Sequence, residues 1–244
     1  MLESIKRMVA RQLAGLAIAG VLVVPLIGFS SGVSTAQKGD VFTGEVRIVD
    51  GDTIVVGTTR VRLEGIDAPE STQTCNRRHS GTWRCGEYAT RHLVRLIGAN
   101  PVHCNDMGLD KYGRTLGRCF AGNVNLNAEM VRSGYAWAFV RYSQAYVAEE
   151  AEARRAGAGI WQGEAMPAWD YRARAWAVAE TQAPGGCTIK GNVTTAGRIY
   201  HMPWSPWYEK VRMDETGRGA PKGKRWFCSE AEALAAGWRP ALTR

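Results

Sequence analysis

The sequence predicts an α+β protein, in which a small closed β-barrel with packed helices is followed by a small α+β unit. The first half contains short β-branched runs separated by turns, and helical patterns come between and after them. A β-rich segment with helices laid against it favours a small barrel. The run Pro184-Gly185-Gly186 separates this region from the rest. The length of 244 residues suits one or two domains.

The expected strands are apolar or alternating runs that flank turn residues. An Asp-Gly turn at residues 50–51 joins the first pair, and a turn at Lys111–Gly113 joins the last pair. The strands are expected at Val41–Val49, Thr53–Val56, Arg60–Ile66, Val102–Cys104 and Thr115–Phe120.

Three helices are expected from apolar residues at helical spacing and from capping signals. They cover Glu87–Gly98, Val124–Ser133 with Asn123 as its N-cap, and Ala145–Ala156, which ends at Gly157. The polar and basic segment Cys75–Cys85 is expected to be a loop.

The C-terminal unit has weaker signals. Short strands are expected at Arg198–His201 and Arg225–Cys228, before a helix at Ser229–Ala236. Ser229 and Glu232 form a capping box at the start of that helix. The expected organisation is therefore an N-terminal segment (1–36), a first domain (41–178), a linker (179–186) and a small domain (187–244).

The N-terminal segment has the pattern of a secretory signal peptide. Lys6, Arg7 and Arg11 precede the apolar run Leu13–Phe29, and small residues follow at Ser34–Ala36. Cleavage would leave a secreted or periplasmic protein. The alternative is an uncleaved anchor in the cytoplasmic membrane, with the remaining chain outside the cytoplasm.

Cysteine usage agrees with export. The chain has six cysteines, an even number, which in an exported protein indicates disulfides. Proximity in the sequence favours Cys75–Cys85, Cys104–Cys119 and Cys187–Cys228 among the possible pairings. A zinc site is disfavoured because no two cysteines form a Cys-X-X-Cys motif.

The charge balance predicts a polyanionic partner. Lys and Arg number 31 against 23 acidic residues, a net charge of +8, which suits nucleic acid or an acidic membrane surface. Composition and patterning exclude collagen, coiled coils and polytopic membrane proteins.

Carboxylates and arginines recur together at the predicted strand ends and turns. The runs Asp50-Gly51-Asp52, Asp67-Ala68-Pro69-Glu70 and Asp110–Arg114 supply the acids, and Arg62 and Arg114 supply the guanidiniums. Hard divalent cations prefer oxygen ligands, and the planar guanidinium makes two bonds to a phosphate. Each residue alone is more often structural, but the ordered set predicts metal-assisted phosphodiester hydrolysis.

That set resembles the thermonuclease family, the staphylococcal-nuclease-like domains. The resemblance covers Val41–Trp161 and is carried by residues 48–53, 61–70, 110–117, 127–136 and 159–161. It implies a five-stranded OB-like barrel with helices and a calcium-dependent nuclease that acts on DNA and RNA, leaving 3′-phosphate ends.

The resemblance also implies roles for single residues. Asp52 and Asp67 would be the carboxylate ligands of one Ca²⁺, with the backbone carbonyl of Ala68 as a third ligand and Asp50 behind them. Glu70 would hold or deprotonate the attacking water, and Arg62 and Arg114 would clamp the phosphate. The nucleotide contacts would be made by Lys111, Tyr112 and Tyr142.

The C-terminal unit resembles an accessory domain of exported thermonuclease-like proteins. Its run through Arg239-Pro240 is also similar to the metal-binding module of Ada DNA-repair proteins, but the paired zinc cysteines are missing. We expect it to contact nucleic acid or the cell envelope. Trp204, Trp207 and Trp226 are candidates for base stacking, and the alternative is that they belong to a core or a partner surface. The alternative for the whole chain is a noncatalytic protein that binds nucleic acid or the envelope through the same barrel.

Overall fold

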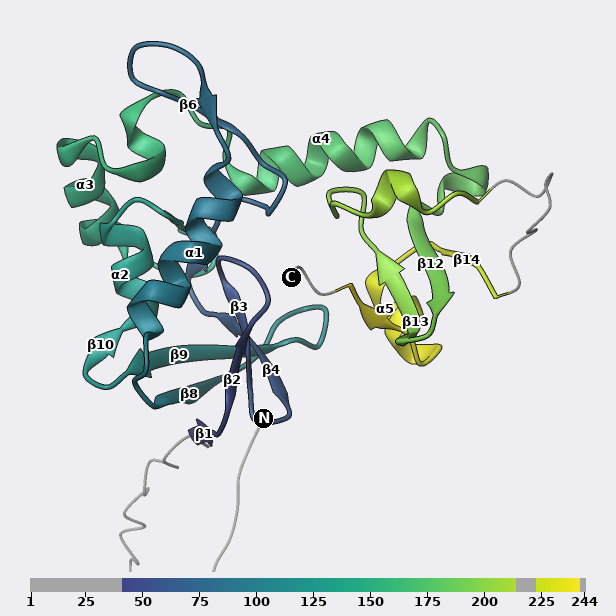
Figure 1. Cartoon of the computed structure of the whole chain (residues 1–244), viewed down its shortest axis with the longest axis horizontal. Helices are drawn as coiled ribbons and strands as arrows, with labels where there is room; N and C mark the ends of the chain where they lie inside the picture. Colours follow the sequence, from purple (N-terminus) through teal and green to yellow (C-terminus); the bar gives the residue numbers. More distant parts are fainter. Residues whose placement is uncertain (1–40, 214–222, 242–244) are drawn as a thin grey trace, which may run out of the picture. The chain divides into compact units, whose positions relative to one another are not determined.

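The computed structural model describes residues 41–213 and 223–241. It is a mixed α+β protein, as the sequence predicts (Figure 1). The predicted N-terminal signal or anchor segment, 1–36, lies outside the described residues. A search of the described ranges finds no helix with the length and apolar character needed to cross a membrane.

The larger sheet gathers strands from the first half of the chain. Its strand order is β1-β8-β9-β4-β3-β2, with β10 paired to β9, and only the β4–β9 pair is parallel. The strands are β1 (Val41–Thr43), β2 (Val46–Ile48), β3 (Thr53–Val56), β4 (Thr59–Leu63), β8 (Val102–Leu109), β9 (Thr115–Ala121) and β10 (Val124–Asn125). A separate two-stranded pair joins β5 (Ile66–Asp67) to β11 (Trp137–Ala138).

The predicted strand Val41–Val49 is divided at Gly44. The φ angle of Gly44 is +145°, and a Cβ there would lie 3.0 Å from the Cα of Gly57. A side chain would therefore be strained at this point, where the chain changes direction. As a result β1 pairs with β8 and β2 pairs with β3. The strands at the two ends of the strand order, β1 and β2, are therefore neighbours in the sequence.

Helices α1, α2 and α3 gather beside this sheet (Figure 1). The helix α1 (Cys85–Ile97) buries Ala89, Leu93 and Ile97 in the main core. Helix α2 (Leu126–Arg132) starts two residues later than predicted, because Val124 and Asn125 pair with β9. Its cap is Asn125 and not Asn123, since the Asn125 side chain accepts from the backbone N–H of Ala128 at 3.1 Å. Helix α3 (Val147–Ala156) ends at Gly157, as predicted.

A second apolar cluster lies beside the main core and holds the start of an unpredicted helix, α4 (Ala168–Glu180). Ala168 is fully buried in this cluster, and the Trp169 ring stacks on Phe139 with 5.5 Å between centroids. The predicted loop Cys75–Cys85 contains a hairpin of β6 (Cys75–Asn76) and β7 (Thr82–Trp83). The short helix η1 (Gly159–Gln162) precedes α4.

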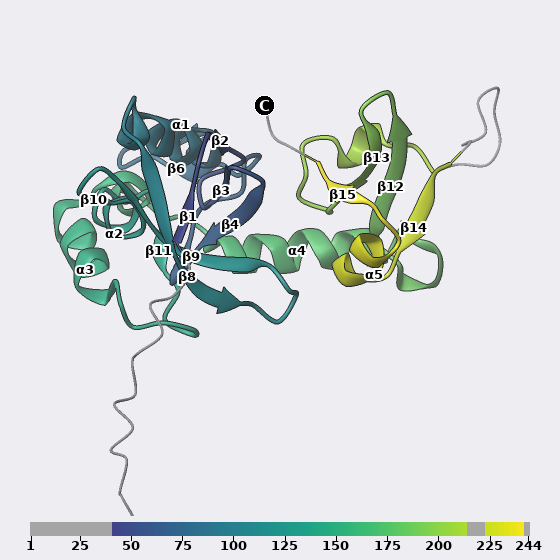
Figure 2. The same cartoon turned by 90° about the horizontal axis from the view of Figure 1, so that it is seen from below.

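The C-terminal residues form a four-stranded sheet in the order β14-β12-β13-β15 (Figure 2). Its elements are η2 (Pro184–Gly186), β12 (Ile189–Thr194), β13 (Gly197–His201), η3 (Tyr208–Lys210), β14 (Arg225–Phe227), α5 (Glu230–Ala235) and β15 (Arg239–Pro240). The sequence did not predict β12. Ser229 caps α5 by accepting from the N–H of Glu232 at 3.1 Å. A third apolar cluster, which includes Tyr200 and Phe227, forms the core of this part.

All six cysteines are paired. The disulfides are Cys75–Cys85, Cys104–Cys119 and Cys187–Cys228, the pairing that sequence proximity favours. Disulfides persist in oxidising compartments, so the cysteine chemistry points away from a reducing environment.

Candidate active site

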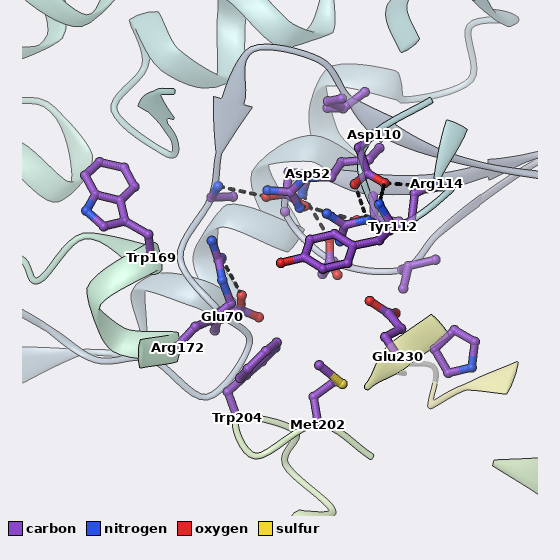
Figure 3. A pocket seen from close by; sticks show the side chains of 18 of the residues that line it. Asp52, Glu70, Asp110, Tyr112, Arg114, Trp169, Arg172, Met202, Trp204 and Glu230 are labelled. Carbon is purple, nitrogen blue, oxygen red and sulfur yellow. Dashed lines mark hydrogen bonds and ion pairs between the residues drawn. The ribbon is translucent and has the colours of Figure 1, made fainter. Parts of the chain in front are cut away.

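A pocket of about 940 Å³ brings most of the predicted functional residues together (Figure 3). Eight of the predicted side chains and Ala68 are among its lining residues, and they come from the β2–β3 turn, β4, the segment after β5, the β8–β9 turn and the segment after β11. The side chains are those of Asp50, Asp52, Arg62, Glu70, Lys111, Tyr112, Arg114 and Tyr142. Asp67 is the exception, since it lies fully buried behind the lining residues.

Arg62 links the two predicted metal-ligand carboxylates. Its Nη1 donates to Asp52 Oδ1 and its Nη2 donates to Asp67 Oδ1, each at 2.6 Å. The pairing of β3 with β4 places Arg62 opposite Thr53, next to Asp52. Burial opposes the charge of the guanidinium, but Asp52 and Asp67 more than offset this and raise the pKa of Arg62. Arg62 therefore stays a cation in this pocket.

The β2–β3 turn orients Asp50 and Asp52, the two acids of the run Asp50-Gly51-Asp52. Asp52 Oδ2 accepts from the backbone N–H of Ala68 at 2.9 Å, and Thr53 Oγ1 donates to Asp52 Oδ1 at 3.0 Å. Burial would raise the pKa of Asp52, but Arg62 and the Ala68 N–H outweigh burial and lower it. Burial and the charge of Asp52 raise the pKa of Asp50 to about 6. Asp52 is therefore the stronger acid of this pair.

Glu70 is held by its backbone as well as by its carboxylate. Its N–H donates to Gln73 Oε1 at 3.2 Å, and Gln73 is itself buried and donates to the Met166 carbonyl at 2.6 Å. Burial raises the pKa of Glu70 to about 8, although the nearby Arg172 opposes the rise. A carboxyl group with a pKa in this range can accept or release a proton near neutral pH.

Arg172 is a site residue that the sequence analysis missed. It extends from α4 and makes three hydrogen bonds of 2.8–3.0 Å to Asp67 and Glu70, and Figure 3 shows its bond to Glu70. The available signal was the helix itself, because Pro167 at its N-cap and Asp170 in its first turn are helix-start features.

The β8–β9 turn holds Arg114 through Asp110. Asp110 Oδ1 accepts from the N–H groups of Tyr112 and Arg114 at 2.9 Å, and Arg114 Nε donates to Asp110 Oδ2 at 2.6 Å. Arg114 therefore contacts this turn and not the Asp52–Asp67 carboxylates. Lys111 lies 4.8 Å from the centre of the exposed Tyr112 ring, and Tyr142 is also exposed. These side chains present cations and aromatic faces at the pocket.

Residues of the C-terminal part also line the pocket, among them Met202, Trp204 and Glu230 (Figure 3). Thr72 Oγ1 donates to the Trp204 carbonyl at 3.0 Å, close in sequence to Glu70. Of the tryptophans proposed for stacking, Trp204 lines the pocket, and Trp207 and Trp226 do not.

The carboxylate oxygens around Arg62 have the chemistry of a hard-cation site. Two carboxylates, of Asp52 and Asp67, lie within reach of one guanidinium, and the backbone of Ala68 adjoins both. Within the described ranges, no group of three or more His, Cys, Asp or Glu side chains is arranged to hold a metal ion. The guanidiniums of Arg62 and Arg172 lie among these acids instead.

Comparisons with known proteins find a family model and relatives that are named as nucleases. Residues 60–163 match the family model described as staphylococcal nuclease homologue. The chain is 39% identical over 150 residues to a micrococcal nuclease of Shigella flexneri, covering 54% of this chain and 80% of that protein. It is 34% identical over 143 residues to an uncharacterised endonuclease of Escherichia coli O157:H7, covering 55% of this chain and 87% of that protein.

A third relative has a different name. The succinoglycan biosynthesis protein ExoI of Rhizobium meliloti is 34% identical over 124 residues, which cover 50% of this chain and 65% of that protein. Because the chain matches the family model and covers most of the length of the two nuclease relatives above, it belongs to the staphylococcal nuclease homologue family. The family match ends before α4, so Arg172 and the C-terminal sheet lie outside it.

Proposed function

We propose that this protein is an exported, calcium-dependent endonuclease that hydrolyses phosphodiester bonds of DNA and RNA and leaves 3′-phosphate ends. The observation that carries the proposal is Arg62, which lines the same pocket as Glu70 and Arg114 and donates to both Asp52 and Asp67 at 2.6 Å. The names of the micrococcal nuclease and endonuclease relatives support the same activity. The leader pattern and the three disulfides support export.

The proposed nuclease domain is 41–178, followed by a linker (179–186) and a small domain (187–244). In this domain we take β1 and β2 as a single strand that is bent at Gly44. Together with β3, β4, β8 and β9 this strand makes a five-stranded OB-like barrel, which is closed because the bent strand pairs with both β8 and β3. The basic C-terminal part, with Trp204 at the pocket, is proposed to contact nucleic acid.

The donor set fits Ca²⁺, because it consists of carboxylate and carbonyl oxygens only. Asp52, Asp67 and the carbonyl of Ala68 would hold the ion, with Asp50 behind Asp52. When bound, the cation would act as a Lewis acid on the scissile phosphate.

The side chains of the pocket supply the remaining steps. Glu70 accepts a proton from a water that attacks phosphorus in line, and the bond from phosphorus to the 5′-oxygen breaks. Arg62 and Arg114 donate to the non-bridging oxygens and stabilise the charge that develops there. Arg114 can do so because Asp110 engages only its Nε, and its terminal nitrogens have no hydrogen bond to the described residues. Lys111, Tyr112 and Tyr142 contact the neighbouring nucleotide through charge and stacking.

The test is degradation of plasmid DNA and of RNA by the full chain, with Ca²⁺ and with a chelator. We expect cleavage only with Ca²⁺, and a large loss of rate in Arg62→Ala and Glu70→Ala. Product ends are read by their sensitivity to a 3′-phosphatase. Binding without cleavage would instead favour the noncatalytic alternative, and unchanged cleavage by either variant would overturn the residue assignment.

A further inference from the structure

Arg172 occupies the carboxylates to which the proposed function assigns the metal and the attacking water. Its Nη1 donates to Glu70 Oε1 at 2.8 Å and to Asp67 Oδ1 at 3.0 Å, and its Nη2 donates to Asp67 Oδ2 at 2.8 Å. The Arg172 side chain is 21% exposed, whereas the Asp67 side chain is 0% exposed. The guanidinium groups of Arg62 and Arg172, which line the pocket, therefore lie between Asp67 and the pocket.

The oxygens of Asp67 leave little room for a further partner. Oδ1 already accepts from both Arg62 and Arg172, which matches the two lone pairs of a carboxylate oxygen. Oδ2 accepts from Arg172 in a two-bond pairing with the same guanidinium. A cation that binds Asp67 directly from the pocket has to compete with Arg172 for these oxygens.

The fold holds Arg172 at this place through its neighbours on α4. Trp169 stacks on Phe139 at 5.5 Å, and the hydroxyl of Tyr171 is 3.0 Å from Thr72 Oγ1, two residues beyond Glu70. Because both contacts lie within the three residues before Arg172 on α4, the helix brings its guanidinium to the acids without requiring a ligand. A flexible side chain on a fixed helix can release the acids while the helix stays in place.

We propose that Arg172 is an internal competitor of the divalent cation. The inference rests on the proposed function, because it takes Asp67 as a metal ligand. In the cation-free protein Arg172 pairs with Asp67 and Glu70, and cation binding requires the guanidinium to leave Asp67. The guanidinium also adds positive charge to a site that must attract a cation. Both effects raise the cation concentration at which the site fills. Arg172 therefore sets a cation concentration below which Asp67 and Glu70 stay paired with its guanidinium.

Calcium affinity, measured by titration calorimetry on the metal-free full chain, tests this competition without any substrate. We expect Arg172→Gln to bind Ca²⁺ about tenfold or more tightly than wild type, because charge-assisted hydrogen bonds that oppose binding are lost. Arg172→Lys keeps the charge without the planar fork, and its affinity should fall between the two. The control is Arg174→Gln, an exposed arginine on the same helix, which should bind like wild type.

Equal or weaker Ca²⁺ binding by Arg172→Gln overturns the proposal, because a residue that assists the metal or only supports the fold would not oppose it. Thermal unfolding gives a second measurement if that variant is poorly stable. The Tm of the variant should be lower than that of wild type in chelator, and added Ca²⁺ should raise the Tm of the variant more than that of wild type. An equal or smaller gain would contradict competition.

The two proposals fail in different ways. If wild type cleaves nucleic acid with Ca²⁺ but Arg172→Gln shows unchanged affinity, the competition fails and the nuclease stands. If wild type cleaves nothing but Arg172→Gln binds Ca²⁺ more tightly, the nuclease fails and the competition stands.

Discussion

Gly86 lies directly against the backbone of Glu70, and a Cβ built on Gly86 would be 1.7 Å from the Glu70 carbonyl oxygen. The first turn of α1 can therefore approach the candidate water-activating residue only because position 86 has no side chain. The neighbouring Cys85 is fixed by its disulfide to Cys75, and the Gly86 N–H donates to the Gln73 carbonyl at 3.3 Å. Residues 70–73 and α1 thus form one packed unit.

Gly86→Ala should displace Glu70 and lower nuclease activity. The clash is with backbone atoms, so we expect a loss of about 1–3 kcal/mol in the free energy of unfolding, as for other overpacked sites. Denaturant unfolding and cleavage rates of the variant measure both effects. Val94→Ala, at an exposed position of the same helix, is the control and should change either quantity little. Wild-type cleavage by Gly86→Ala would show that this contact does not position Glu70.

Arg62→Ala should harm both stability and activity. Its removal leaves Asp52 and Asp67 buried without their shared cation, and breaking such a pair costs about 3–5 kcal/mol. Loss of one transition-state donor typically lowers kcat about 10²–10³-fold. Arg62→Lys should recover part of the stability but little of the rate, because an ammonium cannot bridge two carboxylates as a guanidinium does.

Chemical denaturation and single-turnover cleavage separate these two losses. The control is Arg47→Ala, which removes an exposed arginine from strand β2 of the same sheet. If Arg62→Lys retained the wild-type rate, the two-carboxylate bridge would have no part in the reaction.

The raised pKa of Glu70 predicts a pH dependence of stability in the metal-free protein. Its ordinary pKa of 4.5 rises to about 8 on burial, so between these pH values the folded state binds more protons at this site than the unfolded chain. The contribution of Glu70 to the free energy of unfolding therefore falls as pH rises through this window, and it levels off above the folded pKa.

Glu70→Gln removes this contribution, so the test compares its stability with that of wild type in chelator. The window from pH 6 to 8 is the most informative, because burial and Asp52 raise the pKa of Asp50 only to about 6. We expect the stability advantage of Glu70→Gln over wild type to grow with pH in that window. Parallel curves for the two proteins would contradict a raised pKa at Glu70.

The parts of the fold that the sequence predicts depend on local signals. Gly157 ends α3 and Ser229 caps α5 because turn and cap chemistry is decided within a few residues. The same reasoning placed the start of α2 too early, because residues 124 and 125 extend into a strand pairing with β9 before the helix begins. A pairing partner in another strand is not visible in the local pattern.

Helix α4 and Arg172 were missed for a related reason. Apolar and polar side chains are mixed around α4, so no single apolar stripe marks it as amphipathic. The bond from Arg172 to Asp67 spans 105 residues and depends on how Trp169 packs on Phe139. By contrast, the β2–β3 turn acids and Arg62 lie in short motifs whose strand pairing brings them together, and the structure places them in one pocket.

Asp110 should act as the positioning residue for Arg114. Its Oδ2 holds Arg114 Nε at 2.6 Å while its Oδ1 accepts two backbone N–H groups of the β8–β9 turn. Asp110→Asn can keep acceptors for the turn but weakens the charged bond to Arg114, so we expect kcat to fall several-fold with a smaller change in KM. Asp110→Ala loses both the turn acceptors and the bond to Arg114, so its kcat should fall further.

The same hairpin offers a matched control in Asp106, whose Oδ1 accepts from the exposed Gly108 N–H at 2.8 Å. Asp106→Ala removes a local turn bond of the same kind, but Asp106 has no hydrogen bond to an arginine within the described residues. If the rate depends on the orientation of Arg114, kcat should fall in the Asp110 variants and remain near wild type in Asp106→Ala. Equal losses in both would mean that hairpin rigidity, and not the guanidinium, limits the reaction.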